Sequence, residues 1–149
     1  MKILLSIFAF VLLAANADAQ VTNTQVTSDT VHGRLIKTIT TRGQFVSFDR
    51  NHPDRFFFRD ASDQMEINIV ATEPETDLFL ADHAKDDFKI TYQIRDATVP
   101  GGKTEWLNYA TMLRSLKTGD NVEDWPSKLA ADSDLLERDR EQLAKLREP

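Results

Sequence analysis

Residues 55–71, RFFFRDASDQMEINIVA, constrain the fold of this chain more than any other stretch. Phe56 and Phe58 fall on one side of an alternating pattern, and apolar and polar residues alternate again over residues 65–70. Residues 60–63 supply turn chemistry between the two parts. We therefore predict a β-hairpin with one apolar face, and other elements must cover that face, because an isolated hairpin is marginally stable.

Three further segments predict strands. Residues 31–49 are rich in β-branched and aromatic side chains, and Gly43 near their middle is the expected place for a bulge or a sharp bend. Residues 88–95 alternate between apolar and polar side chains, which predicts one buried face and one wet, basic face. Residues 106–116 contain Trp, Tyr and Thr, so we expect a strand in at least their first half.

Two segments predict helices. Residues 76–85 follow a proline and acidic side chains and end in a lysine, which suits the two ends of a short helix. Residues 124–148 begin with Asp124 as a cap and Pro126 in the first turn, and leucines recur among many charges. Because the apolar stripe is thin, three arrangements stay open: this helix lies across the sheet, pairs with another copy, or sits in solvent.

The predicted order is three strands, a short helix, two strands and an appended helix. Five strands with a helix between the third and the fourth is the plan of the OB-fold, a small, partly open Greek-key barrel. We therefore predict a mainly β chain, with an OB-like barrel at residues 31–118 and a C-terminal amphipathic helix at residues 124–148. The side chains expected inside the barrel are Phe56, Phe58, Met65, Ile67, Ile69, Phe88, Ile90, Tyr92 and Ile94.

The beginning of the chain has the features of an export signal. Lys2 precedes a nearly unbroken apolar run at residues 3–15, and small residues follow, which predicts a signal peptide at residues 1–19. The run is shorter than the ~20 apolar residues of a spanning helix, so a membrane anchor is the weaker alternative. Residues 20–30 are polar and are expected to be a flexible leader. We expect a periplasmic or secreted protein with no membrane span after cleavage.

Composition excludes several function classes. The chain has no Cys, which excludes disulfides, thiol catalysis and thiolate metal sites. A net charge of -6 disfavours nucleic acid as a partner, because binding to phosphate backbones depends on Lys and Arg. Ser47, Ser62 and Ser115 lack the sequence surroundings of a nucleophile, and the three histidines are scattered. We predict no catalytic residue and no cofactor.

A basic spot on the outer face of the barrel is the best candidate for a binding site. The predicted ligand-binding residues are Arg42, Phe57, Arg59, Lys89 and Arg95. The four cations are expected to capture an anion, and Phe57 is the outward-facing aromatic residue that could stack on a ligand. For Arg59 and Asp60 a structural role is the favoured interpretation: Asp60 accepts backbone N–H groups in the turn, and Arg59 pairs with a neighbouring carboxylate.

One cluster has the residue types of a metal site. Its members are Asp82, His83, Asp86 and Asp87, and His83 precedes Asp87 by four residues, as ligands on one helix face would. Nothing else in the sequence marks a third convergent ligand. We therefore favour a solvated helix end and predict no metal.

Part of the chain resembles a known family. TRGQFV at residues 41–46 is followed by FFRDAS at residues 57–62 and INI at residues 67–69. This pattern resembles the bacterial OB-fold family of small periplasmic stress-associated proteins, which carry a signal peptide, a glycine in the first strand and a hydrophobic-Phe-Arg-Asp-Ala-Ser/Thr stretch. The resemblance covers residues 41–96. It implies a non-enzymatic periplasmic protein that is linked to envelope stress tolerance and binds a small molecule or ion.

Three functions follow as hypotheses. The first is an exported, non-enzymatic OB-fold binding protein for a small ligand or ion in envelope stress tolerance. The alternative is a structural or adaptor protein that docks a periplasmic partner protein through its C-terminal helix. A weaker third is a secreted hydrolase that uses carboxylates for acid-base chemistry, and the fold alone does not choose among them.

Overall fold

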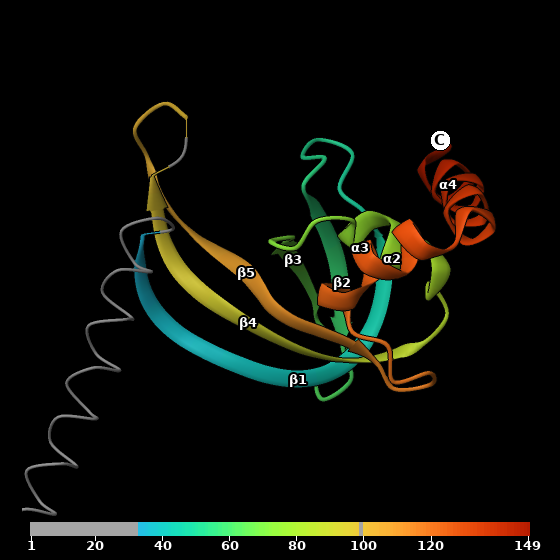
Figure 1. Cartoon of the computed structure of the whole chain (residues 1–149). Coiled ribbons are helices and arrows are strands. Elements are labelled where there is room, and N and C mark those ends of the chain that lie inside the picture. Colours follow the sequence, from blue (N-terminus) through green and yellow to red (C-terminus); the bar gives the residue numbers. More distant parts are fainter. Residues whose placement is uncertain (1–32, 99) are drawn as a thin grey trace, which may run out of the picture.

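The computed structural model describes residues 33–98 and 100–149 (Figure 1). The predicted signal peptide at residues 1–19 and the leader at residues 20–30 lie outside the described residues. The strands are β1 (Arg34–Phe48), β2 (Arg55–Asp60), β3 (Glu66–Val70), β4 (Asp87–Thr98) and β5 (Thr104–Ser115). The helices are α2 (Thr76–Asp82), the short 3-10 helix η1 (Val122–Asp124), α3 (Trp125–Ala131) and α4 (Ser133–Arg147).

The five strands form one mixed sheet whose hydrogen bonds close into a ring. β1 pairs antiparallel with both β2 and β4, β2 pairs with β3, and β4 pairs with β5. The ring closes where β3 meets β5 in a parallel pair between Val70 and Tyr109. The prediction of a mainly β chain with five strands and a helix between the third and the fourth is confirmed. The strand expected in at least the first half of residues 106–116 is confirmed and extends over Thr104–Ser115.

Gly43 is the residue at which β1 packs most closely against its neighbours. It lies opposite Asp60 of β2 and opposite Phe88 of β4. A Cβ atom at this position would lie 1.9 Å from the carbonyl oxygen of Arg59 and 2.6 Å from a ring carbon of Phe58. Because real Cβ atoms do not approach so closely, only glycine allows β1 to lie against β2 here.

The irregularity that we expected at Gly43 lies elsewhere in β1. The register against β2 shifts between Phe45 and Ser47, and the register against β4 shifts between Leu35 and Lys37. Gly43 is paired on both edges of the strand, so an extra residue has no room there. The shifts therefore fall on either side of the doubly paired segment.

The core lies within the ring and beneath the helices. Its buried members are Phe45, Phe56, Phe58, Ile69, Leu78, Phe79, Leu80, Phe88, Ile90, Tyr92, Ala110, Leu113, Val122, Trp125 and Leu129. Ile67 and Ile94 are partly buried against this core, as the alternation predicts. Met65 is a wrong prediction, because it is 62% exposed. It precedes the first residue of β3 and belongs to the turn, where its N–H donates to the Asp63 carboxylate at 3.0 Å.

The C-terminal segment forms two helices instead of the single helix predicted at residues 124–148. The break is at Asp132, whose backbone is extended. Its carboxylate accepts hydrogen bonds from the N–H groups of Asp134 and Leu135, each at 3.1 Å, and so caps α4. Asp124 stands at the start of α3 as predicted, but its side chain makes no capping bond.

The C-terminal helices cover one end of the sheet. α4 packs against α2 and touches β1, and Trp125 and Leu129 of α3 are part of the buried core. Leu135, Leu136 and Leu143 of α4 are partly buried against it. Figure 1 shows the three helices together on one side, while the β4–β5 hairpin and the first part of β1 extend away from them. Of the three arrangements left open, the one in which this segment sits in solvent is wrong, because α4 packs mainly on α2 and touches β1. Pairing with another copy stays a prediction.

We predict that Gly43→Ala destabilises the protein by about 1–3 kcal/mol, because the added methyl group must displace the backbone of β2. Urea unfolding measures the change. The control is Ser47→Ala, at an exposed position of the same strand, for which we expect a change within about 0.5 kcal/mol. Equal stability of the two variants would contradict the close packing at Gly43.

Candidate binding site

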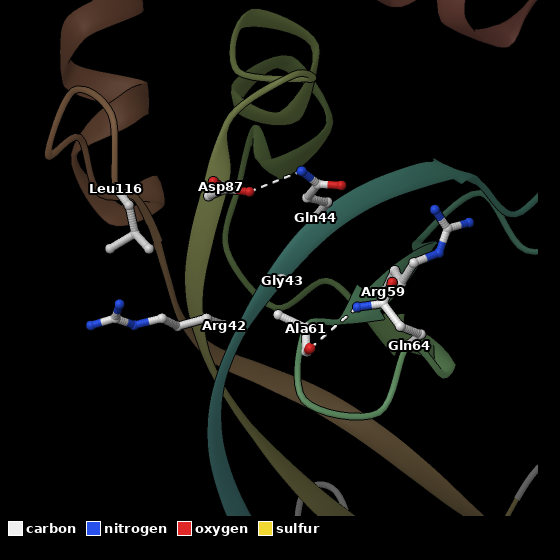
Figure 2. Close-up of a pocket in the computed structure, with 8 residues that line it drawn as sticks. All are labelled: Arg42, Gly43, Gln44, Arg59, Ala61, Gln64, Asp87 and Leu116. Atoms are coloured by element: carbon white, nitrogen blue, oxygen red, sulfur yellow. Dashed lines mark hydrogen bonds between the residues drawn. The ribbon is translucent and has the colours of Figure 1, made fainter.

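A pocket of about 290 Å³ lies where β1 passes over the β2–β3 turn (Figure 2). It is lined by Arg42, Gly43, Gln44, Arg59, Ala61, Gln64, Asp87 and Leu116. Successive side chains of a strand point to opposite faces. Because Gly43 faces the interior, its neighbours Arg42 and Gln44 both point outward, and both are exposed.

A buried carboxylate fixes the turn beneath this pocket. Oδ1 of Asp60 accepts from the Ser62 hydroxyl at 2.6 Å, from the Ser62 N–H at 2.8 Å and from the Thr41 hydroxyl at 3.0 Å. The hydrogen bonds from Ser62 and Thr41 lower the pKa of Asp60, although burial opposes them. The Ala61 N–H donates to the Arg42 carbonyl at 2.8 Å and so attaches the turn to β1. The predicted turn role of Asp60 is confirmed.

The two arginines of the pocket differ in their partners. Arg59 Nη2 donates to Glu66 Oε1 at 2.8 Å, which confirms the predicted pairing with a neighbouring carboxylate. The Arg42 side chain extends on the Leu116 side of β1, on the opposite side from Arg59 (Figure 2). It is exposed, and among the described residues nothing accepts a hydrogen bond from its guanidinium or forms an ion pair with it.

The acidic residue on the pocket wall is already engaged. Oδ1 of Asp87 accepts from Gln44 Nε2 at 2.9 Å, a bond that joins β4 to β1 (Figure 2). Asp87 keeps its negative charge, but among the described residues it forms no ion pair with Arg42.

The structure brings some of the predicted binding residues together and separates others. Lys89 lies directly opposite Arg42 on the neighbouring strand, and both are exposed. Arg59 lines the same pocket from the other side of β1. Phe57 is half-buried on the outer side of β2, in register with Ser47 and Asn68, and does not line the pocket.

Arg95 is not on the wet face of its strand, and that prediction is wrong. Its exposed fraction is 1%. Nη2 and Nε donate to Gln93 Oε1 at 2.7 and 3.0 Å, and Nη1 donates to the Gly33 carbonyl at 2.9 Å. Gly33 lies so close to Asp96 that a Cβ would stand 1.6 Å from the Asp96 carbonyl oxygen. Gly33, the residue before β1, therefore lies against Arg95, and the burial pattern of β4 changes phase after Tyr92.

The solvated helix end predicted at residues 82–87 is also wrong, because His83 and Asp86 are buried. His83 is 2% exposed and stacks on Phe79 with ring centroids 4.4 Å apart. Its Nδ1 lies 2.9 Å from the Phe79 carbonyl oxygen, and its Nε2 lies 3.1 Å from Oδ2 of Asp120. Burial raises the pKa of Asp120, but hydrogen bonds from Lys128, His83 and a threonine outweigh it and lower the pKa to about 2.

The acidic residues around His83 form hydrogen bonds with separate partners. Asp86 accepts from the Ser115 hydroxyl at 2.7 Å, and Asp82 accepts from Arg138 Nη2 at 2.8 Å. Among the described residues, no three His, Asp or Glu side chains lie close enough together to hold a metal ion. The cluster instead connects α2 to β5 and α4.

A fully buried acid on α4 was missed by the sequence analysis. Asp139 Oδ2 accepts from Trp125 Nε1 at 3.0 Å, while its Oδ1 accepts no hydrogen bond from any described residue. Burial raises the pKa of Asp139 to about 7, the neighbouring Asp82 carboxylate adds to this rise, and the bond from Trp125 opposes it. The signal was its position: Asp139 lies four residues from both Leu135 and Leu143, inside the apolar stripe.

A second pocket, of about 420 Å³, lies between the end of β1 and the last turn of α4. Arg147 on its wall is engaged, because its guanidinium stacks over Phe48 at 5.0 Å and pairs with Asp77 at 3.4 Å. Because Arg147 already pairs with Asp77, it offers a ligand in this pocket less positive charge than an unpaired arginine would.

No family model, no curated protein and no solved structure matches this chain. In residues 33–98 and 100–149, no helix has both the length and the apolar character that crossing a membrane requires. The function is therefore argued from the geometry of the site.

We predict that Asp139 makes the protein less stable as the pH rises. The folded chain holds this proton up to a pH of about 7, whereas the unfolded chain releases it near the ordinary pKa of 3.8. Between these values the folded state binds more protons, so the contribution of Asp139 to the free energy of unfolding is full below pH 3.8 and is lost as the pH rises through 7. Besides burial, the groups that shift the pKa of Asp139 are Arg138, Asp82 and Trp125.

The variant Asp139→Asn tests this dependence, because its amide imitates the protonated acid. We expect Asp139→Asn to be about 1–3 kcal/mol more stable than the parent at pH 8, where the parent buries an incompletely bonded charge. The two should converge near pH 4. Urea unfolding at several pH values measures the difference, with the exposed Glu141→Gln on the same helix as the control. Parallel pH curves for parent and Asp139→Asn would contradict the raised pKa.

Proposed function

We propose that this chain is an exported, non-enzymatic binding protein with an OB-fold, and that it holds a small anion on the outer face of its sheet at Arg42. One observation carries the proposal: Arg42 is exposed in a pocket wall, and no described residue neutralises it. An unpaired guanidinium presents a rigid fork of donors that matches a carboxylate or a phosphate.

The strand order supports the OB-fold. A ring of five strands in the order β1-β2-β3-β5-β4, with a helix between β3 and β4, is what this fold requires. The residues that carry the family resemblance also meet at the pocket: Gly43 and Ala61 line it, and Asp60 and Ser62 fix the turn below. Export and a link to envelope stress tolerance rest on the predicted signal peptide and on that resemblance.

A binding role fits the pocket better than hydrolysis. Paired carboxylates are needed for acid-base cleavage, whereas the lining of this pocket includes a single one, Asp87, which is bonded to Gln44. Asp60, the buried acid of the turn beneath the pocket, is occupied by the donors of its own turn and has a lowered pKa, so it is a poor proton donor at neutral pH.

An adaptor role through the C-terminal helix is the alternative. Against it, α4 uses Leu135, Leu136 and Leu143 on the core of this same chain, and Arg138 pairs with Asp82 of α2. Of the five leucines at residues 124–148, Leu146 is the exposed one, at 40%. A partner that bound the apolar face of α4 would first have to displace α2.

The test is a titration with inorganic orthophosphate, followed by amide chemical shifts in NMR. We expect shifts at Arg42, Gly43 and Gln44, and we expect Arg42→Gln to weaken binding by about tenfold, the loss of one charge-assisted contact. Arg59→Gln should have a smaller effect, because Glu66 already holds that side chain.

The matched control for this titration is Arg140→Gln, which removes the same charge from an exposed position on α4. It should bind orthophosphate as the parent does. Equal binding by the parent and Arg42→Gln would overturn the proposed function.

A further inference from the structure

We infer that Arg42 is one end of a row of three cations, and that the ligand is a small soluble anion with two or more linked phosphate groups. This inference rests on the proposed function and extends it to a ligand class. Arg42 of β1 lies opposite Lys89 of β4, and Lys89 lies opposite Arg114 of β5. We call these three residues the cationic row.

The register of the sheet places the whole row on the outer face. The pairs on either side of it are buried: Gly43, Phe88 and Ser115 lie opposite one another, and so do Ile90 and Leu113. Side chains alternate between the two faces, so Arg42, Lys89 and Arg114 all point outward, and all are exposed. Neighbouring strands lie about 4.8 Å apart, so the row spans about 10 Å of backbone.

The row is unneutralised, although the chain has more acids than bases. In the part of the chain that the structure describes, no side chain forms an ion pair with any of the three, whereas Arg34, Arg59 and Arg138 each pair with a carboxylate. Like charges directly opposite one another destabilise a sheet. A bound polyvalent anion removes this repulsion and gains contacts with all three residues.

The row lies between two threonines and one aspartate. On one side are Thr40 and Thr91, whose hydroxyl oxygens are 2.8 Å apart; one hydroxyl donates to the other, which leaves one hydroxyl donor for a phosphate oxygen. On the other side lies Asp87, which accepts from Gln44. A linear anion therefore fits along the row, across the strands.

Two larger classes of anion fit this face less well. Among the described residues, the row has no aromatic neighbour in register on which a base could stack, and the exposed Trp106 lies eight residues from Arg114, about 25 Å along β5. A membrane or a nucleic acid is large enough to come within a Debye length, about 10 Å, of further acidic side chains of this chain, whose net charge is -6. The binding of a small ion is governed by the local charge of the row.

The test compares orthophosphate, pyrophosphate and tripolyphosphate by calorimetry at one ionic strength. We expect tripolyphosphate to bind the parent at least about tenfold more tightly than orthophosphate, because it reaches further cations. In the double variant Lys89→Gln/Arg114→Gln this ratio should fall to about threefold or less, while binding of orthophosphate at Arg42 persists. The control Arg140→Gln/Lys145→Gln removes two exposed charges from α4 and should keep the parental ratio.

The outcomes separate this inference from the proposed function. Equal affinities for the three phosphates, or an unchanged ratio in Lys89→Gln/Arg114→Gln, would overturn the row and leave the Arg42 site intact. If the parent shows no phosphate binding that depends on Arg42, both the cationic row and the proposed function are overturned. Tighter, row-dependent binding of phosphatidylglycerol vesicles or of a single-stranded oligonucleotide than of tripolyphosphate would overturn the ligand class.

The stability of the double variant provides a second measurement that needs no ligand. Removing repelling charges should leave Lys89→Gln/Arg114→Gln at least as stable as the parent at low salt, and the difference should shrink as salt is added. A less stable double variant would show that these side chains support the sheet, and it would overturn the inference that the row is reserved for an anion.

Discussion

The close approach of Gly43 to the Arg59 carbonyl is the constraint on which the rest of the structure depends. β1 pairs with β2 on one edge and with β4 on the other at this residue, and a side chain would collide with β2. The same geometry determines the candidate site, because the residue before Gly43 must point outward when Gly43 faces inward. Arg42 is thus presented to solvent next to the close contact between β1 and β2, and the turn at Ala61 is attached to its carbonyl.

Buried polar groups secure the helices to the sheet as much as leucines do. His83, at the end of α2, joins the loop before η1 through Asp120, and Trp125 of α3 joins α4 through Asp139. Buried polar groups of this kind are favourable only when their partners are in place. They therefore help to fix the position of α4 on α2. This explains why α4 packs against its own chain and does not extend into solvent.

The sequence predicted those features that depend on local alternation and failed where a distant strand decides. The inward side chains of β2 and β4 follow from period two as far as Tyr92. Arg95 breaks the pattern because Gly33 lies over it. Met65 breaks the pattern because β3 starts one residue later, at Glu66. The break at Asp132 has a local cause, a strong capping residue within a helical pattern. Arg114 joined the site only through the register of β5, which periodicity does not supply.

The central claim is that an anion binds where Arg42 leaves the sheet, and a crystal structure of the protein with pyrophosphate tests it most directly. We expect density for one phosphate against the Arg42 guanidinium and for the next beside Lys89, with Asp87 still bonded to Gln44. Pyrophosphate bound instead in the second pocket, between Arg50 and Arg147, with Arg42 in contact with solvent alone, would contradict the claim.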